Sequence, residues 1–315
     1  MTDYKNEQIW RDMQTHLPPK NRLSDVNVPD EYFIPINGMD IHIDHYQNDN
    51  AKARVILFHG VGGNGRVLSL IALPLFQSGY DIVCPDLPLY GCTQTNNIAI
   101  TYDTWVACGK SIVQHYQSKD NLSTFVFGLS AGGMLAYQVA CECEDISGIL
   151  ATCILDQRDI NVTKATASSP LIATLGKPLM RITYKLFGRI RIPMRFIGNM
   201  KAITNDADLA ELLMGDKKSA GVSVPLSFVY TMLEPEISVE PENFDKCPFI
   251  LVHPEDDRWT DISVSRIFYD RLSCKKELHM LKGAGHVPVE EYGLRQMEEC
   301  CIDFLENTLD KVDDV

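Results

Sequence analysis

The sequence lacks any long hydrophobic segment. None of its apolar runs approaches the ~18 uncharged residues that a helix needs to cross a bilayer. Residues 1–22 are polar and lack the apolar core of a secretory signal. We therefore expect a cytoplasmic protein. At 315 residues, of which 45% are hydrophobic and 23% charged, the chain is long enough for one large domain with an insertion or for two small domains.

Positive charge is also scarce. The sequence has 29 Lys and Arg residues against 42 Asp and Glu residues, which gives a formal net charge of −13. Because nucleic-acid phosphates require a basic surface, this balance argues against a nucleic-acid partner. The ten cysteines lack the paired spacing of a zinc site, and several lie within apolar segments. We interpret them as small buried residues in a reducing compartment, and we expect no metal or cofactor.

Short apolar segments alternate with longer amphipathic ones, a pattern that predicts a mostly parallel sheet covered by helices. Asn37-Gly38 separates two strand-like segments, residues 31–36 and 39–46, and predicts a hairpin turn. Residues 54–58 are apolar almost throughout, which predicts a strand buried on both faces. We predict further strands at residues 80–84, 124–127, 149–155, 248–252 and 277–281, and helices at residues 67–78, 102–117, 134–141, 263–272 and 289–309.

Residues 157–245 interrupt this alternation. They are irregular and mainly helical in pattern, and they contain no convincing buried strand. We interpret this segment as a cap inserted into an α/β core that consists of residues 31–156 and 246–315. Residues 1–30 would then form an N-terminal helical extension. No internal repeat or low-complexity tract occurs.

The most informative motif is Gly128-x-Ser130-x-Gly132, which lies between a predicted strand and a predicted helix. A serine that presents its hydroxyl at the edge of a sheet must occupy a sharp, strained turn. The glycines on either side allow the neighbouring backbone to approach closely. The following helix directs its N-terminus at the serine and favours negative charge there. The motif therefore predicts a nucleophile at Ser130.

A nucleophilic serine needs a base, and the base needs an acid that orients it. His286 lies in a glycine-rich loop after the last predicted strand, whereas several other histidines fall within strands or a helix. We predict His286 as the base. The acid should follow the preceding strand, where three adjacent carboxylates occur. Asp257 is our first choice, Asp256 the second and Glu255 the third, and the chain order of serine, acid and histidine is the one expected for such a motif.

Acyl transfer also requires N–H donors for the tetrahedral oxyanion. The N–H of Ala131, directly after the nucleophile, should be one of them. The other should come from residues 59–63, the glycine-rich loop after the first long buried strand, where Val61 is our first choice and Gly62 the second. We expect Gly62 and Leu129 to contact the substrate, and the histidine that opens the loop to brace it. Because no Lys-Ser or Lys-Thr follows these glycines, we do not interpret them as a phosphate-binding loop.

Together these motifs resemble those of the α/β-hydrolase superfamily, in particular the capped serine hydrolases that include monoacylglycerol lipases and lysophospholipases. The resemblance rests on residues 59–63, 86–91 and 128–132 and on Gly285-His286, and it extends over roughly residues 34–309, with the cap matched in position only. It implies a mostly parallel eight-stranded sheet flanked by helices, an inserted cap and a serine triad. Pro254 stands where the family has glycine before its acid, and the elbow reads Leu-Ser-Ala rather than His-Ser-Met, which indicates a divergent member.

The predicted cap is locally basic. Between Asp159 and Asp206 the sequence has no acidic residue but eight basic ones, interleaved with large apolar residues. Such segments are typical of surfaces that meet lipid headgroups or an amphiphile with an anionic head. A cap helix that packs an apolar stripe on the core and exposes its charges to water would show the same pattern. We hypothesise that the cap admits a substrate with an apolar tail and contacts membrane surfaces transiently.

The preferred function is a carboxylic-ester hydrolase that forms an acyl-enzyme on small-molecule esters, with monoacylglycerols or lysophospholipids suggested by the resemblance. The same triad also serves amidases, aminopeptidases and carbon–carbon bond hydrolases. An aminopeptidase should offer carboxylates near the pocket, for which Glu234, Glu236 and Glu240 are candidates. A hydrolase scaffold that only binds a ligand is the third possibility, which a fluorophosphonate probe would distinguish. The sequence sets no oligomeric state.

Overall fold

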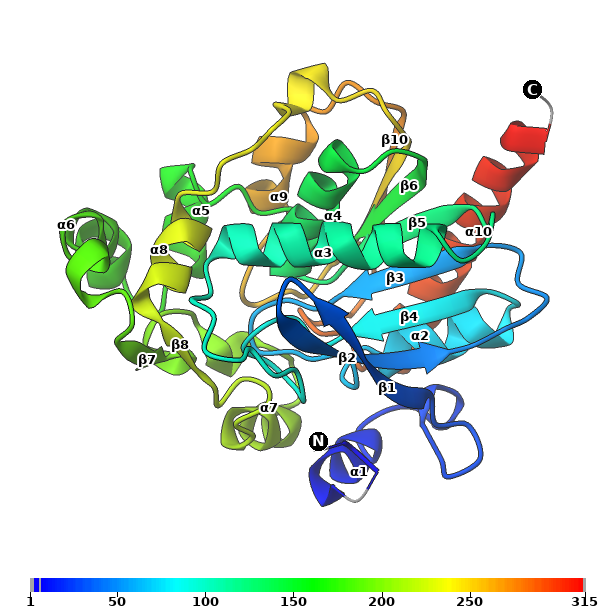
Figure 1. The fold of residues 1–315 in the computed structure, drawn as a ribbon, viewed down its shortest axis with the longest axis horizontal. Helices are drawn as coiled ribbons and strands as arrows, with labels where there is room; N and C mark the ends of the chain where they lie inside the picture. Colours follow the sequence, from blue (N-terminus) through cyan, green and yellow to red (C-terminus); the bar gives the residue numbers. More distant parts are fainter. Residues whose placement is uncertain (1–2, 6, 314–315) are drawn as a thin grey trace.

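The computed structural model describes residues 3–5 and 7–313, and an eight-stranded sheet forms its centre (Figure 1). The strands lie in the order β1-β2-β4-β3-β5-β6-β9-β10. β1 and β2 are antiparallel to each other, β2 is antiparallel to β4, and all the other neighbours are parallel. The predicted mostly parallel sheet is confirmed. The strands are β1 (Asp30–Ile36), β2 (Met39–Tyr46), β3 (Arg54–Phe58), β4 (Asp81–Pro85), β5 (Thr124–Gly128), β6 (Ile146–Ala151), β9 (Phe249–Pro254) and β10 (Lys276–Leu281).

The first two predicted strands form the expected hairpin. Asn37 and Gly38 join β1 to β2 with φ angles of 50° and 77°, the positive values that a two-residue turn of this kind requires. β3 is buried along its whole length, as its continuous apolar sequence predicted. It lies between β4 and β5 in the middle of the sheet, where helices cover both faces.

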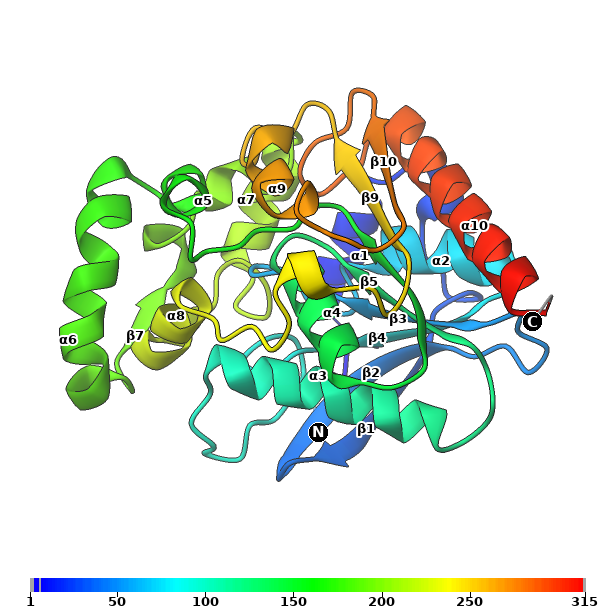
Figure 2. The ribbon, with the colours of Figure 1, turned by 90° about the horizontal axis from the view of Figure 1, so that it is seen from above.

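Helices cover the two faces of the sheet (Figure 2). α3 and α4 pack against each other on one face, and α9 lies beside α4 through a contact between Tyr137 and Phe268. α2 and α10 pack together on the other face. These helices are α2 (Ser69–Gln77), α3 (Tyr102–Gln117), α4 (Ala131–Glu142), α9 (Ile262–Tyr269) and α10 (Glu291–Asp313).

One predicted strand is displaced. Residues 149–155 were expected to form it, but β6 begins at Ile146 and ends at Ala151. After Thr152 the chain leaves the sheet, and Cys153 and Leu155 become buried in a small cluster with Val162 and Val264. The apolar run therefore continues past the strand because a second hydrophobic cluster buries its last residues.

Between β6 and β9 the chain forms a largely helical segment, which lies at one end of the molecule (Figures 1 and 2). It also contains a two-stranded antiparallel sheet that the sequence analysis missed. Each strand has only three residues and is partly exposed, too short for an alternating pattern to show. The elements are α5 (Ile160–Thr166), a wide helical turn η2 (Ile172–Gly176), α6 (Lys177–Phe187), β7 (Arg191–Pro193), α7 (Ala207–Gly215), β8 (Ser223–Pro225), α8 (Leu226–Leu233) and the short turns η3 (Met194–Phe196), η4 (Met200–Ala202) and η5 (Pro241–Asn243).

The N-terminal segment is helical only in part. It holds α1 (Gln8–Gln14) and the short turn η1 (Pro19–Asn21), whereas residues 22–29 form no helix. Residues 1, 2 and 6 of the expected helical extension lie outside the described residues. α1 buries Trp10 and Met13. No helix among the described residues is both long and apolar enough to cross a membrane.

Candidate active site

Ser130 occupies the turn between β5 and α4, with φ of 58° and ψ of −126°. This is a strained conformation for a residue with a side chain, as expected for a nucleophile at a sharp strand-to-helix turn. The surrounding packing explains the glycines. A Cβ on Gly128 would lie 2.0 Å from the carbonyl oxygen of Gly132, and a Cβ on Gly132 would lie 2.2 Å from the carbonyl oxygen of Phe58. Only glycine fits at either position.

A chain of hydrogen bonds links Ser130 to His286 and Asp257. Ser130 Oγ lies 2.8 Å from His286 Nε2, and His286 Nδ1 lies 2.7 Å from Asp257 Oδ2. The three side chains come from the ends of β5, β9 and β10, so the parallel strands bring them to one edge of the sheet. The ring of Trp259 packs against the His286 ring, with their centres 4.8 Å apart. The imidazole is therefore held between the serine and the carboxylate.

The carboxylate of Asp257 is buried and accepts several hydrogen bonds. Its side chain is 1% exposed. Oδ1 accepts from the backbone N–H groups of Trp259 and Thr260, and Oδ2 accepts from the Thr260 hydroxyl at 2.8 Å. Burial alone would raise the pKa of Asp257, but the attraction of His286 and the hydrogen bonds from His286 and Thr260 outweigh it and lower the pKa to about 2. Asp257 is therefore ionised at neutral pH.

The two alternative acids lie elsewhere. Glu255 and Asp256 are both exposed. The backbone of Asp256 is engaged, because its N–H donates to Ala284 and its carbonyl oxygen accepts from the side-chain amide of Asn205. Of the three adjacent carboxylates, Asp257 is the one that contacts His286.

The loop after β3 approaches the Ser130 turn closely. A Cβ on Gly60 would lie 2.7 Å from the Cβ of Ser130, and the N–H of Gly63 donates to the carbonyl oxygen of Gly60, which closes a turn around Val61 and Gly62. Val61 and Ala131 line the same cavity as Ser130. Within the described residues, neither the Val61 N–H nor the Ala131 N–H donates a hydrogen bond to protein. Both remain available to an oxyanion.

His59, the first residue of this loop, has the bracing contacts that we predicted. Its Nδ1 donates to the carbonyl oxygen of Gly60 at 2.8 Å, and its Nε2 accepts from the N–H of Leu87 at 3.0 Å. The side chain is fully buried, and burial lowers its pKa to about 4. A neutral imidazole therefore ties the loop to the segment after β4.

The remaining predicted residues, Gly62 and Leu129, lie beside the triad but not on the main cavity. Both line a narrow hollow that they share with Ser130 and His286. Gly62 has a φ of 86°, which allows the loop to turn sharply next to Ile203. A contact with substrate at these two residues remains a prediction.

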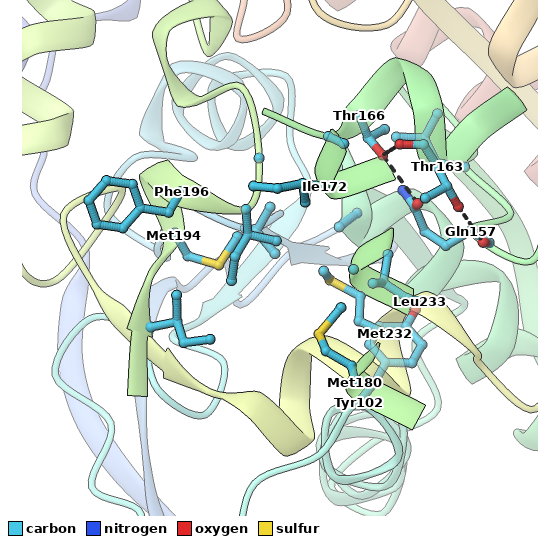
Figure 3. A pocket seen from close by; sticks show the side chains of 18 of the residues that line it. Tyr102, Gln157, Thr163, Thr166, Ile172, Met180, Met194, Phe196, Met232 and Leu233 are labelled. Atoms are coloured by element: carbon cyan, nitrogen blue, oxygen red, sulfur yellow. Dashed lines mark hydrogen bonds between the residues drawn. The ribbon is translucent and has the colours of Figure 1, made fainter. Parts of the chain in front are cut away.

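The main cavity, with a volume of about 380 Å³, begins at Ser130 and extends under the segment between β6 and β9 (Figure 3). Its lining contains no charged residue. Gln157, Thr163 and Thr166 gather on one side of this view, and Met194 and Phe196 lie on the other. The apolar lining includes Leu155, Ile172, Met194, Phe196, Leu226 and Leu233. No sequence motif identifies these residues as a cavity lining, since they come from several short elements whose arrangement has no sequence signature.

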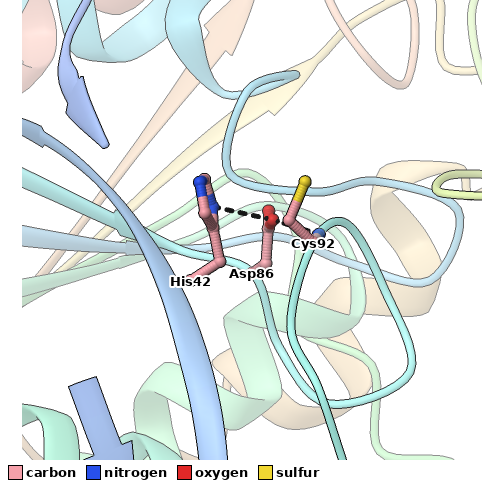
Figure 4. A group of neighbouring side chains, drawn as sticks. All are labelled: His42, Asp86 and Cys92. Atoms are coloured by element: carbon pink, nitrogen blue, oxygen red, sulfur yellow. Dashed lines mark hydrogen bonds and ion pairs between the residues drawn. The ribbon is translucent and has the colours of Figure 1, made fainter. Parts of the chain in front are cut away.

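A cluster of potential metal ligands lies away from the triad. His42, Asp86 and Cys92 are buried and close together (Figure 4). Protein groups already occupy their atoms: Asp86 accepts from the N–H of Cys92, and Lys218 Nζ lies 3.1 Å from Cys92 Sγ. Burial and Asp86 raise the pKa of the Cys92 thiol to about 12, whereas a metal would require the thiolate. The donor set does not fit a metal ion, and we interpret the cluster as a buried ion-pair network.

His42 is the centre of this network. Its Nδ1 lies 3.0 Å from Asp86 and its Nε2 lies 3.1 Å from Glu31. Burial alone would lower the pKa of His42, but the neighbouring carboxylates outweigh it and raise the pKa from 6.5 to about 10. Because folding raises the pKa of His42, its protonation stabilises the folded state. This contribution is complete below pH 6.5 and is lost as the pH rises through about 10.

We therefore expect His42→Gln to lower the free energy of unfolding by about 3 kcal/mol or more near neutral pH, because buried carboxylates lose their cation. The difference from wild type should narrow as the pH rises toward 10. Urea unfolding over a pH series measures this difference in the free energy of unfolding. His279→Gln is the control, because His279 is a partly exposed histidine on β10. A difference that stayed constant or widened over this range would contradict a protonated His42.

The sheet order, the strained serine and the hydrogen-bonded histidine and aspartate define a serine hydrolase of the α/β-hydrolase fold. Comparison with known families agrees. Residues 49–292 match the model of the family described as serine aminopeptidase, S33. The chain belongs to this family.

Several of the proteins that this chain resembles are monoacylglycerol lipases. The chain is 24% identical over 259 residues to a thermostable monoacylglycerol lipase from Bacillus sp. (strain H-257), which covers 81% of this chain and 91% of the relative. Its fold is similar to that of a soluble variant of monoglyceride lipase from Saccharomyces cerevisiae in complex with a substrate analog, with a TM-score of 0.75, 18% identity and coverage of 92% and 99% of the two chains. It is also similar to a Paleococcus ferrophilus monoacylglycerol lipase, with a TM-score of 0.65, 17% identity and coverage of 85% and 99%.

Proposed function

We propose that this protein hydrolyses carboxylic esters whose acyl group is a hydrocarbon chain, with Ser130 as nucleophile, His286 as base and Asp257 as the orienting acid. The observation that carries the proposal is the uncharged cavity, which begins at a serine already hydrogen-bonded to a histidine. A cavity of this size and lining suits a flexible apolar ligand with few polar groups. The monoacylglycerol lipases among the relatives support a lipid-like substrate.

The reaction follows from the positions of the polar atoms. His286 Nε2 accepts the hydroxyl proton of Ser130 while Oγ attacks the acyl carbonyl. The N–H groups of Val61 and Ala131 donate to the oxyanion that develops. His286 then gives its proton to the leaving alcohol, and a water molecule activated by the same nitrogen releases the acid. Throughout, the ionised Asp257 stabilises the positive charge on the imidazole.

An aminopeptidase is the alternative within this family. It would need a carboxylate at the cavity to bind the substrate ammonium group, and the lining provides none. Of the three carboxylates considered from the sequence, Glu234 pairs with Lys177 at 3.0 Å and Glu240 pairs with Arg158. Glu236 does not line the cavity. The charges therefore favour an ester with an apolar acyl chain over a peptide with a free N-terminus.

The test is turnover of p-nitrophenyl esters with acyl chains of two to sixteen carbons beside a panel of aminoacyl anilides. We expect ester turnover with a preference for medium or long chains and little anilide turnover. Dominant anilide turnover would favour the aminopeptidase. Absence of turnover on both panels, without fluorophosphonate labelling, would favour a protein that only binds its ligand.

Chain-length selection should depend on Ile172, which lies on the cavity wall (Figure 3). Ile172→Trp adds an aromatic ring to this wall, so we expect kcat/KM for the longest chains to fall by about tenfold while two-carbon esters are hydrolysed as before. Ile160→Trp is the matched control, because Ile160 is 49% exposed and does not line the cavity. Unchanged kcat/KM for the longest chains would show that the acyl chain does not extend to Ile172, and an equal loss on all chain lengths would contradict a selective block.

A further inference from the structure

The helix α6 lies at the extreme end of the molecule in both views (Figures 1 and 2). One of its faces is turned inward: Met180 and Thr183 line the cavity, and Tyr184 stacks on Tyr230 with the ring centres 4.1 Å apart. None of the residues of α6 is buried. The opposite face of this helix is therefore free to meet something outside the chain.

The outer face carries an apolar stripe. Ile182 and Leu186 lie four residues apart on α6, away from the side that carries Met180, and Leu171 and Leu175 precede them along the chain. They are large and well exposed, with fractional exposures from 56% to 81%. The stripe consists of Leu171, Leu175, Ile182 and Leu186, whereas Leu179 between them lines the cavity. Large exposed apolar residues that gather in one patch mark an interaction site.

Basic side chains flank the stripe. Arg181 and Lys185 lie four residues apart on one side of α6, and Arg189 follows just after its end. Among the described residues, none of the three forms an ion pair with a carboxylate. The sequence has no acidic residue between Asp159 and Asp206, although the protein as a whole carries a net charge of −13. The cations beside the stripe are therefore uncompensated.

We propose that the outer face of η2 and α6 docks on lipid surfaces that contain anionic phospholipids, with the stripe inserted at the headgroup boundary and the three basic residues against the phosphates. An amphipathic helix that binds in this way combines an apolar face with lysines and arginines beside it. Charge complementarity identifies the occupant, because this patch is basic on an otherwise acidic protein.

A second copy of the chain fits this face less well. A symmetric dimer through α6 would bring Arg181, Lys185 and Arg189 of one copy against the same residues of the other, without carboxylates between them. Docking on lipid has a further consequence, which rests on the proposed function. Because Met180 on the same helix lines the cavity, the cavity wall would lie next to the lipid from which an amphiphilic ester could enter.

The experiment is co-sedimentation of the intact Ser130→Ala protein, which leaves the lipid unaltered, with phosphatidylcholine vesicles and with vesicles that also contain phosphatidylglycerol. We expect stronger binding to the anionic vesicles. The triple variant Arg181→Glu, Lys185→Glu, Arg189→Glu should weaken that binding by at least about tenfold, since each cation near an anionic surface contributes about 1 kcal/mol. The double variant Ile182→Asn, Leu186→Asn should weaken binding to both kinds of vesicle.

The matched control reverses three exposed lysines away from α6, Lys119→Glu, Lys275→Glu and Lys282→Glu, and should retain most of the vesicle binding. Carried on the Ser130 background, the α6 variants should keep wild-type turnover of a short soluble ester, which separates docking from the chemistry. Failure of the Ser130→Ala protein to bind either vesicle, or equal losses in the control and the α6 triple variant, would overturn the proposal. So would a dimer in light scattering that the double variant converts to monomer.

Discussion

Replacing Ser130 with alanine should abolish ester turnover, with a loss of about 10⁴- to 10⁶-fold in kcat. The loss should be this large because the oxygen that attacks the carbonyl is removed, while the oxyanion donors and the cavity can supply only the residual catalysis over water. Steady-state kinetics on the preferred p-nitrophenyl ester measures the effect. Labelling by a fluorophosphonate should disappear at the same time, since it requires an activated serine.

The variant should remain folded, because it removes one oxygen from a buried side chain. Its urea unfolding midpoint and its vesicle binding provide the check. If Ser130→Ala retained labelling or more than about a hundredth of the wild-type turnover, another residue would be the nucleophile and the proposed function would be wrong. Loss of turnover with retained fold would leave Ser130 as the attacking group.

The second large effect concerns the carboxylate behind the imidazole. Asp257→Asn keeps the size of the side chain but replaces the acceptor of the His286 Nδ1–H bond with a neutral amide. The imidazole then loses both its fixed tautomer and the charge that stabilises its protonated form. We expect kcat to fall by roughly 10³- to 10⁴-fold, with KM nearly unchanged.

Asp256→Asn is the matched control, since it makes the same chemical change one residue earlier at an exposed position. It should keep kcat within about twofold of wild type. A large loss in Asp256→Asn with near-normal activity in Asp257→Asn would reverse the assignment.

The ionised Asp257 also contributes to stability. Because the pKa of Asp257 is lowered to about 2, its stabilisation of the folded state is present above pH 3.8 and is lost as the pH falls through about 2.

Much of the core could be predicted because each signal was local. β3 and α3 begin and end where the sequence indicated, since one is a continuous apolar run and the other a longer amphipathic segment. The β6 error arose where burial by a second cluster imitated a strand. The β7–β8 pair was missed because its strands depend on a partner about 30 residues away in the chain rather than on a pattern of their own.

The residues of the site also differ in how far the sequence predicted them. Ser130, His286 and Asp257 could be proposed from motifs because their backbone surroundings demand particular residue types. Thr260, which donates to Asp257, was missed although it lies only three residues beyond it. An apolar site under the cap was expected from the sequence, but the residues that line the cavity could not be predicted, since its shape depends on how several short elements pack. The cytoplasmic location and the boundaries of the cap stay predictions.

The order of the strands along the chain also determines when the catalytic residues are synthesised. Ser130 follows β5, whereas its hydrogen-bonding partner His286 comes 156 residues later, after β10. Ribosomes add about 5–20 residues per second, so the base is synthesised roughly 8 to 30 seconds after the serine. β9 and β10 add to one edge of a sheet whose other strands are already made. During synthesis Ser130 therefore has no base until the last strands of the sheet have formed. The serine becomes reactive only after nearly the whole chain has been made.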